Sequence, residues 1–383
     1  MHNLDDETMA LLRLTMCEGI GDDAVHRLVD TFGSAGAVME ASRSDLTRVQ
    51  GLGNTLAERI TTGPPDERVD KELDLMDRAR TRLLPFHADD YPLPLKQLGR
   101  SAPPLLRIRG EYSRDDMLSV AIVGSRNCTH YGRSQARRFG MALSGYGFTI
   151  ISGLARGIDT EAHRAAVQAN GRTIALMGCG LARIDTVEDP ELALSITENG
   201  ALISELSMEA PPLPRHFPPR NRLISGLALG VLVVQAGRKS GSLISARWAG
   251  EQGKDIFAIP GQVNSPASHG CHQLIRDGAL LVEKPAEVLD DLGPLPEEFR
   301  QHAKNQHEDI DTGGEDSEKS HAVSLTDNQE KVLELLGSEP RQIDDIIDET
   351  GMSPPVVSSA LLTMEIKGLV EKLSGQRYVL RNR

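Results

Sequence analysis

The chain has 383 residues, of which 39% are hydrophobic, and a formal net charge of −13, so its length predicts two or three folded units and its charge argues against nucleic acid as a partner. The longest apolar run, Leu227–Val234, is too short to cross a bilayer, and the acidic start Met1–Glu7 is unlike a signal peptide, so a cytoplasmic protein with no membrane segment is expected. Neither a zinc site nor a disulfide framework is predicted, because the four cysteines are widely spaced and include no C-x-x-C pair.

Residues 1–84 are predicted to form an all-α domain. Two Gly-apolar-Gly turns, Gly19–Gly21 and Gly51–Gly53, lie 32 residues apart, and a helix-like run follows each of them. This pairing is typical of helix-hairpin-helix packing. Such turns can present N–H groups to a phosphate, but Asp22 and Asp23 directly after the first turn would repel one. DNA contact and a purely structural helical cap both stay open, and the cap is favoured.

Residues 85–292 are predicted to form a Rossmann-like α/β domain. Short β-branched runs alternate here with amphipathic stretches, which predicts a doubly wound, mostly parallel sheet with helices on both faces. Ligands of such sheets bind beyond the carboxyl ends of the strands, so the loops at that edge are the candidates for function. The expected strands are Ser119–Val123, Thr149–Ser152, Thr173–Met177, Ala201–Ser204, Val231–Val234, Ile256–Ile259 and Leu280–Val282.

The charge of the central part differs from the average of the chain. Residues 117–292 hold 17 basic side chains, 14 of them Arg, against 16 acidic ones. Arg suits phosphate because its planar guanidinium can donate two hydrogen bonds to one group. This block is therefore compatible with phosphate binding in spite of the acidic total.

The C-terminal part is predicted to be a winged helix at residues 324–383, joined through a flexible acidic linker at residues 293–323. Most of the expected helix that would read DNA in a winged helix lies within Pro354–Met364, which carries no charge. Partner binding or regulation is therefore favoured over DNA reading for this helix. Three expected helices and a hairpin support the interpretation: Gln329–Leu336, Ile343–Thr350, Val356–Lys367, and Gly368–Leu373 with Gln376–Leu380.

Two loops of the central domain combine small residues with one cation each. Gly124, Ser125 and Arg126 follow the first expected strand, and a second turn of the same kind, Ser152–Gly157, follows the next one. Small residues let the backbone approach an oxyanion, which the cation can then contact from the side. Asp159 and His163, four residues apart, are open to two interpretations: an acid/base pair, or the favoured alternative of a helix N-cap and a packed histidine.

A third loop, Pro214–Arg222, holds three arginines, a histidine and a phenylalanine among prolines. One interpretation has Phe217 and His216 stacking on bases while the arginines contact phosphates. The other places Phe217 in the core and leaves the arginines solvated.

A fourth loop, Gly237–Ser242, offers N–H groups, hydroxyls and cations at a helix start, as a phosphate nest does. Neither G-x-G-x-x-G nor G-x-x-x-x-G-K-[ST] occurs, so no cofactor and no ATP hydrolysis are predicted.

The predicted nucleic-acid-binding residues are the small, polar, aromatic and cationic side chains of these four loops. They are Gly124, Ser125, Arg126, Ser152, Gly153, Arg156, Gly157, Arg215, His216, Phe217, Arg220, Asn221, Arg222, Lys239, Ser240, Gly241 and Ser242. Because the chain has few aromatic residues, phosphate contacts are expected to dominate over base stacking and to make binding strongly dependent on salt.

Taken in order, several motifs of residues 85–292 resemble the DNA-processing protein A (DprA/Smf) family. They are Ala121–Arg126, Ser152–Asp159 with Ala162 and His163, Phe217–Leu227, Ser240–Ile244, and Phe257–Gly261 through Gly270–Ile275. The resemblance implies a homodimeric single-stranded-DNA-binding protein, not an enzyme, which protects incoming DNA in natural transformation and helps to load RecA recombinase onto it. It also implies that Arg126 and the loops Ser152–Gly157 and His216–Arg222 line the strand-binding pocket.

One loop departs from the family pattern. After Gly178–Leu181 the family usually continues with an Asp and then Tyr-Pro, whereas this chain has Ala182–Thr186. That edge of the pocket is therefore expected to be rebuilt, with Arg183 as a candidate cation.

Two other functions remain as alternatives. The first is a nucleotide-processing enzyme of the phosphoribohydrolase (lysine-decarboxylase-like) group, whose motif Pro-Gly-Gly-x-Gly-Thr-x-x-Glu ends in a catalytic glutamate. Aligning its Gly-Thr on Gly241 and Ser242 puts Ser245 where that glutamate would stand. The second is a nucleotide-sensing module, which would bind a mononucleotide tightly but not oligonucleotides.

Overall fold

The computed structural model describes residues 4–292, 295, 326–337, 339–366, 369–373 and 375–380. The linker predicted at residues 293–323 lies outside the described residues, apart from Leu295. The chain divides into two compact units, one of residues 1–128 and 135–306 and the other of residues 129–134 and 307–383. In the described part of the chain, no helix has the length and apolar character needed to span a membrane.

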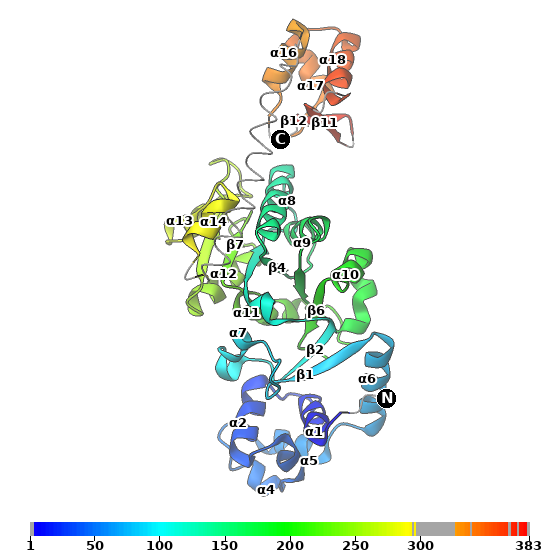
Figure 1. Ribbon diagram of the computed structural model, residues 1–383, viewed down its shortest axis with the longest axis vertical. Coiled ribbons are helices and arrows are strands. Elements are labelled where there is room, and N and C mark those ends of the chain that lie inside the picture. The colour runs from blue at the N-terminus through cyan, green and yellow to red at the C-terminus, as the bar shows by residue number, and fades with distance from the viewer. Residues whose placement is uncertain are drawn as a thin grey trace. The chain divides into compact units, whose positions relative to one another are not determined.

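The N-terminal region is helical, as predicted (Figure 1). Gly19 and Gly51 have φ angles of 85° and 84°, a left-handed conformation that glycine adopts at little cost. Gly21 and Gly53 then serve as N-caps of the following helices. The two predicted hairpins are thus confirmed. The helices are α1 (Asp6–Thr15), α2 (Asp22–Phe32), α3 (Ala35–Glu40), α4 (Arg43–Leu46), α5 (Asn54–Thr62) and α6 (Asp66–Arg78).

The two hairpin turns are fixed against each other by a reciprocal pair of arginines. Arg27 on α2 donates to the backbone oxygen of Gln50 at 2.6 Å, and Arg59 on α5 donates to that of Glu18 at 2.8 Å. Both arginines and both carbonyls are 32 positions apart, the same spacing as the turns. The hairpins are therefore related by an internal two-fold pseudosymmetry.

Within residues 4–292, the main sheet has nine strands in the order β1-β2-β6-β5-β4-β3-β7-β8-β9. All seven predicted strands are present, nearly at their predicted bounds, and their mutual pairings are parallel. The sequence patterns did not predict β1 and β2, which pair antiparallel with each other and join the sheet through β6. The strands are β1 (Thr81–Pro85), β2 (Leu105–Gly110), β3 (Ser119–Val123), β4 (Thr149–Ser152), β5 (Thr173–Leu176), β6 (Gly200–Ser204), β7 (Gly230–Val233), β8 (Asp255–Ala258) and β9 (Leu280–Leu281).

Both faces of the sheet are buried, because alternate residues of the strands enter two different cores. Ala175 and Leu202 pack in a core shared with the N-terminal helices, whereas Ile174 and Leu176 pack in a core shared with Leu223. The remaining helices of this unit are α7 (Leu93–Lys96), α8 (His130–Gly145), α9 (Ile158–Gln168), α10 (Pro190–Ile196), α11 (Phe217–Leu227), α12 (Ser242–Glu251), α13 (His269–Arg276) and α14 (Pro285–Asp291).

The C-terminal unit is a winged helix, as predicted. Three helices surround a core that includes Val332, Ile346 and Leu361, and a three-stranded antiparallel sheet has the order β10-β12-β11. Its elements are α16 (Asp327–Leu335), β10 (Arg341–Gln342), α17 (Ile343–Thr350), α18 (Pro354–Ile366), β11 (Val370–Leu373) and β12 (Arg377–Leu380).

Candidate nucleic-acid interface

All four predicted loops contribute residues to a cavity of about 760 Å³, called here the central cleft, although the loop Ser152–Gly157 does so only through Ala155. The cleft lies beyond the carboxyl ends of β3 and β7, two neighbouring parallel strands from which the strand order runs in opposite directions. Such a switch point is where open α/β sheets bind their ligands. Ten predicted site residues line the cleft: Gly124, Ser125, Arg126, Phe217, Arg220, Asn221, Lys239, Ser240, Gly241 and Ser242.

A buried cation is among the residues that line the cleft. Arg220 is only 3% exposed, and its Nη1 donates to the backbone oxygen of Leu176. Burial lowers the pKa of Arg220 to about 10, opposed by the nearby carboxylate of Asp159, so the side chain stays protonated at neutral pH. Its Nε has no acceptor among the described protein atoms. A buried donor without a partner is costly, so an anionic ligand in the cleft would relieve it.

Glycine at position 153 makes room for this cation. A Cβ atom added to Gly153 would collide with the Arg220 guanidinium. The N–H of Gly153 also donates to Oδ2 of Asp159 at 3.2 Å, which ties the loop after β4 to the first turn of α9. Gly153 and Ser152, which is buried and donates to the backbone oxygen of Ile122 at 2.6 Å, therefore support the cleft from behind rather than lining it.

An aromatic ring and two guanidinium groups lie close together in the cleft. The guanidinium carbon of Arg126 is 4.8 Å from the centroid of the Phe217 ring, and that of Arg220 is 5.8 Å from it. Contacts at this distance are favourable because the ring face is electron-rich. Phe217 is half-buried and lines the cleft, whereas Arg126 is exposed. The ring is therefore available to a ligand instead of being enclosed in the core.

The start of α12 forms another part of the lining. The hydroxyls of Ser240 and Ser242 lie 2.8 Å apart, and Nδ2 of Asn221 donates to the backbone oxygen of Gly241 at 3.3 Å. No side chain caps this helix. Its first N–H groups and the exposed Lys239 give this part of the cleft the properties of an anion site.

Three of the predicted arginines, and two residues next to them in the sequence, lie outside the central cleft or at its margin. Arg156 donates to the backbone oxygen of Arg126 at 3.2 Å and to Oδ1 of Asn127, next to the cleft. Gly157 precedes α9 as its N-cap. Three residues line a second cavity instead: Arg215, His216 and Arg222.

Arg222 is engaged in a buried ion-pair network. Its Nη2 is 2.6 Å from a carboxylate oxygen of both Asp22 and Glu205, and its side chain is 9% exposed. Burial and the second carboxylate together raise the pKa of Asp22 to about 7. These surroundings favour a structural role for Arg222, which joins the first hairpin to the sheet.

The surroundings of Asp159 and His163 favour a structural role over a catalytic one. His163 is fully buried, its Nδ1 lies 2.7 Å from Oγ1 of Thr173, and burial lowers its pKa to about 3. The expected N-cap role of Asp159 is wrong: the cap is Gly157, and Asp159 lies inside the first turn, where its carboxylate binds the N–H of Gly153.

The cleft also includes residues that the sequence patterns did not mark. Pro212 and Pro214 belong to the proline-rich segment of residues 211–215 and were not among the predicted site residues, and Ser245 was predicted only as the position of an enzyme's glutamate. In the loop that departs from the family pattern, residues Leu181–Thr186 form a 3₁₀ turn, and the exposed Arg183 is not among the cleft residues.

The fold and this cleft define a protein of three modules, with an anion-binding cleft at the switch point of the middle one. Three family models match in the same order: a SAM-like helix-hairpin-helix tandem at residues 11–62, DNA recombination-mediator protein A at residues 82–293, and the DprA winged helix domain at residues 317–376. The chain belongs to the DNA processing protein A (DprA/Smf) family, as its motifs predicted.

Similar proteins span most of the chain. Protein Smf of Escherichia coli K12 is 36% identical over 379 residues, which cover 98% of this chain and 96% of that protein. DNA processing protein DprA of Streptococcus pneumoniae R6 is 42% identical over 201 residues, covering 52% of this chain and 71% of that protein.

Two solved structures share the fold. The X-ray structure of DNA processing protein A from Streptococcus pneumoniae superposes with a TM-score of 0.63 at 32% identity, over 75% of this chain and 99% of that one. DNA processing protein A from Helicobacter pylori, whose structure concerns a single-stranded DNA binding mode, gives 0.50 at 30% identity, over 56% and 95%.

Proposed function

We propose that this chain binds single-stranded DNA in the central cleft, in the cytoplasm, and acts without catalysing a reaction. The observation that carries the proposal is the buried Arg220, with its unpaired Nε, next to the ring of Phe217. In the role that the family resemblance implies, the protein protects incoming strands in natural transformation and helps to load RecA recombinase onto them.

The chemistry of the cleft suits a single strand. Arg126, Lys239 and the start of α12 supply cations and N–H groups for phosphates, and the half-buried Phe217 supplies a surface on which one base stacks. The bases of a duplex are already paired and stacked on each other, so they cannot reach such a ring without being displaced. The proposal therefore requires preference for single-stranded over double-stranded DNA.

The enzymatic alternative has less support from the cleft. Ser245 stands where the catalytic glutamate of the phosphoribohydrolase group would be, and Asp159 is the one carboxylate among the residues described as lining the cleft. The Asp159 carboxylate is already bound by the N–H of Gly153. No other described residue that lines the cleft is an aspartate, a glutamate or a histidine.

The first test replaces the exposed cation of the cleft. Arg126→Ala is expected to weaken binding of a labelled single-stranded oligonucleotide by about 1.5–3 kcal/mol, the size of a hydrogen bond to a charged group. Fluorescence anisotropy measures the affinity, with duplex of the same sequence as competitor. Arg247→Ala is the control, because Arg247 is 80% exposed on α12 and does not line the cleft. Equal affinity of Arg126→Ala and wild type would remove Arg126 from the interface, and absence of binding by wild type at low salt would refute the function.

We also infer a homodimer, with the edge strand β9 as its contact. Leu280 and Leu281 on this strand are 39% and 48% exposed, although leucines on a monomer's surface gain from being covered. An edge strand also leaves backbone groups unpaired, which a second copy can cover. Leu281→Glu is expected to shift the mass in solution from dimer to monomer, measured by light scattering. The control is Leu93→Glu, at a 57% exposed leucine on α7; an unchanged mass for Leu281→Glu would place the contact elsewhere.

A further inference from the structure

The proline-rich segment that borders the central cleft also borders a second cavity of about 740 Å³, called here the hairpin cavity. Pro212 and Pro214 line the central cleft, whereas Pro211, Leu213 and Arg215 line the hairpin cavity. The alternation holds although the segment is not a strand: the N–H of Leu213 donates to the backbone oxygen of Pro211 at 2.8 Å, and Pro214–His216 form a 3₁₀ turn. The segment is thus a thin wall with one binding surface on each side.

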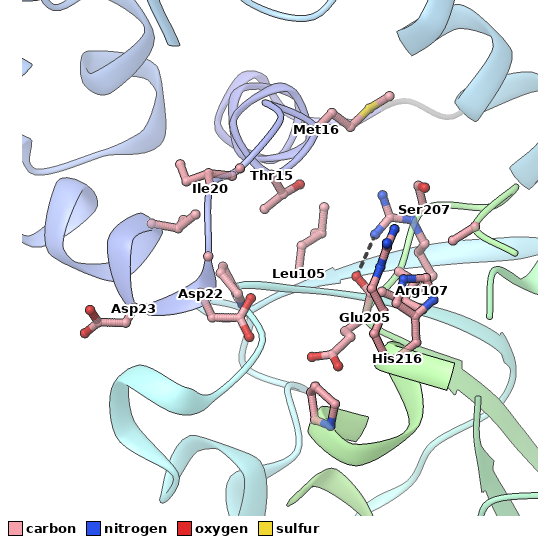
Figure 2. Close-up of a pocket in the computed structure, with 18 of the residues that line it drawn as sticks. Thr15, Met16, Ile20, Asp22, Asp23, Leu105, Arg107, Glu205, Ser207 and His216 are labelled. Carbon is pink, nitrogen blue, oxygen red and sulfur yellow. Dashed lines mark hydrogen bonds between the residues drawn. The ribbon is translucent and has the colours of Figure 1, made fainter. Parts of the chain in front are cut away.

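The hairpin cavity is lined by the turn between α1 and α2, the start of β2, the loop after β6 with the proline-rich segment, and residues of α6 and α11. Figure 2 shows the side chains of Asp22, Arg107, Glu205 and His216 around it. His216 is half-buried, and its Nδ1 lies 3.0 Å from the backbone oxygen of Pro211. This contact fixes the imidazole on the wall.

Each acidic group of the hairpin cavity is within ion-pair distance of an arginine. Asp22 and Glu205 share Arg222, as described above, and Asp23 is 2.8 Å from a guanidinium nitrogen of Arg27. The buried Arg107, in turn, is matched by Glu72 at 2.6 Å. Inside the cavity, positive and negative charges therefore largely cancel.

Two cations of the cavity have no such partner. Arg68, on α6, and Arg215, on the wall, are both exposed, and no carboxylate within ion-pair distance is found for either among the described residues. Arg100 adds a third cation, with one exposed contact to Asp30 at 3.3 Å. The side chains that remain free to bind a ligand are therefore cationic, and they lie on different elements of the cavity lining.

We propose that the hairpin cavity is a second subsite for the same single strand. The strand leaves the central cleft, crosses the proline-rich wall, and its next phosphates contact Arg215 and then Arg68, with a base against His216. The inference rests on the proposed function. A polynucleotide fits better than an isolated phosphate for two reasons. The unpaired cations lie on separate elements, so one phosphate cannot contact them all. The buried arginines are already paired with carboxylates, so they are not free to bind an isolated phosphate.

The test compares a four-nucleotide with a sixteen-nucleotide oligothymidylate, measured by anisotropy at several salt concentrations. The double variant Arg68→Ala/Arg215→Ala is expected to bind the short oligonucleotide as wild type does and the long one about tenfold more weakly. The slope of log affinity against log salt should fall in magnitude by about 1.4 for the long strand, since each lost phosphate contact on a single strand accounts for about 0.7. Arg78→Ala, an exposed arginine at the other end of α6, is the matched control.

The outcomes separate the two proposals. If the double variant binds the long strand with wild-type affinity and slope, the second subsite is refuted while the central cleft stands. Equal losses for both lengths also refute it, because the two arginines would then act at the cleft or on the fold. Thymidine monophosphate is also added to wild type as a competitor. If it lowers the affinity for the long strand to that of the double variant and no further, the cavity is a mononucleotide site and not a strand subsite. Failure of wild type to bind either length would refute the proposed function itself.

Discussion

Arg220→Met is expected to lower the free energy of unfolding by about 3 kcal/mol and to abolish single-stranded DNA binding. Arg220 is 3% exposed and Asp159 is 7% exposed. The variant therefore leaves a buried carboxylate without the nearby cation and leaves the backbone oxygen of Leu176 without its donor. Both losses are costly because neither group can turn to water.

Urea unfolding followed by circular dichroism measures the effect. If the loss comes from the unpaired carboxylate, Asp159→Asn combined with Arg220→Met should recover part of it, and the double-mutant cycle gives the coupling. Arg126→Met, on the exposed part of the same cleft, should weaken binding while leaving stability within about 0.5 kcal/mol. If Asp159→Asn changes the free energy of unfolding by the same amount in wild type and in Arg220→Met, the two residues are not coupled.

The deficit of Arg220→Met should also depend on pH. Burial raises the pKa of Asp159 and the cation of Arg220 opposes this increase, so removing the cation raises the pKa further. An acid whose pKa is higher in the folded than in the unfolded state binds its proton more tightly when folded, so its contribution to stability falls as pH rises through that interval. The variant should therefore be closer to wild type at pH 5 than at pH 8. An equal deficit at both values would contradict this origin.

The strands that could be predicted are those in which no charged residue interrupts the apolar run. β3 and β7 are buried on both faces, so their sequences reveal them directly. β2 escaped prediction because Arg107 interrupts its apolar run, although that arginine is only 2% exposed. Its counter-ion, Glu72, lies 35 residues earlier on a helix, and no local pattern can indicate such a pair.

The central cleft could be anticipated because the carboxyl ends of parallel strands meet at one edge. Which of the predicted residues line the cleft was harder to predict. Arg220 and Arg222 were predicted together, but two positions on an α-helix differ by about 200° around the axis. Arg220 therefore faces the cleft, and Arg222 faces the first hairpin. The helical period of α11 would have separated them, had the loop not been expected to extend to Arg222.

The ion pair between Arg107 and Glu72 is expected to be the other position of large effect. Arg107→Met should lower the free energy of unfolding by about 3–5 kcal/mol, the cost of removing one partner of a buried pair. Nε of Arg107 donates to Oε1 of Glu72 at 2.6 Å, and the side chains are 2% and 5% exposed. The Glu72 carboxylate also accepts the N–H of Met208, at 3.0 and 3.1 Å to its two oxygens. One carboxylate thus joins α6, β2 and the loop that leads to the proline-rich wall.

The same urea experiment separates the pair from simple packing. Arg107→Met/Glu72→Met should regain part of the lost stability, because apolar residues of similar volume replace a buried ion pair at little cost, while the N–H of Met208 loses its acceptor. Arg82→Met is the control, since Arg82 on β1 makes a comparable ion pair with Asp90 but is 39% exposed, and its loss should stay below about 1 kcal/mol. If Arg107→Met is no worse than Arg82→Met, the Arg107–Glu72 pair does not hold the N-terminal helices on the sheet. If the predicted loss is found, the position of the hairpin cavity depends on one buried charge pair, and strand binding by long oligonucleotides should weaken with it.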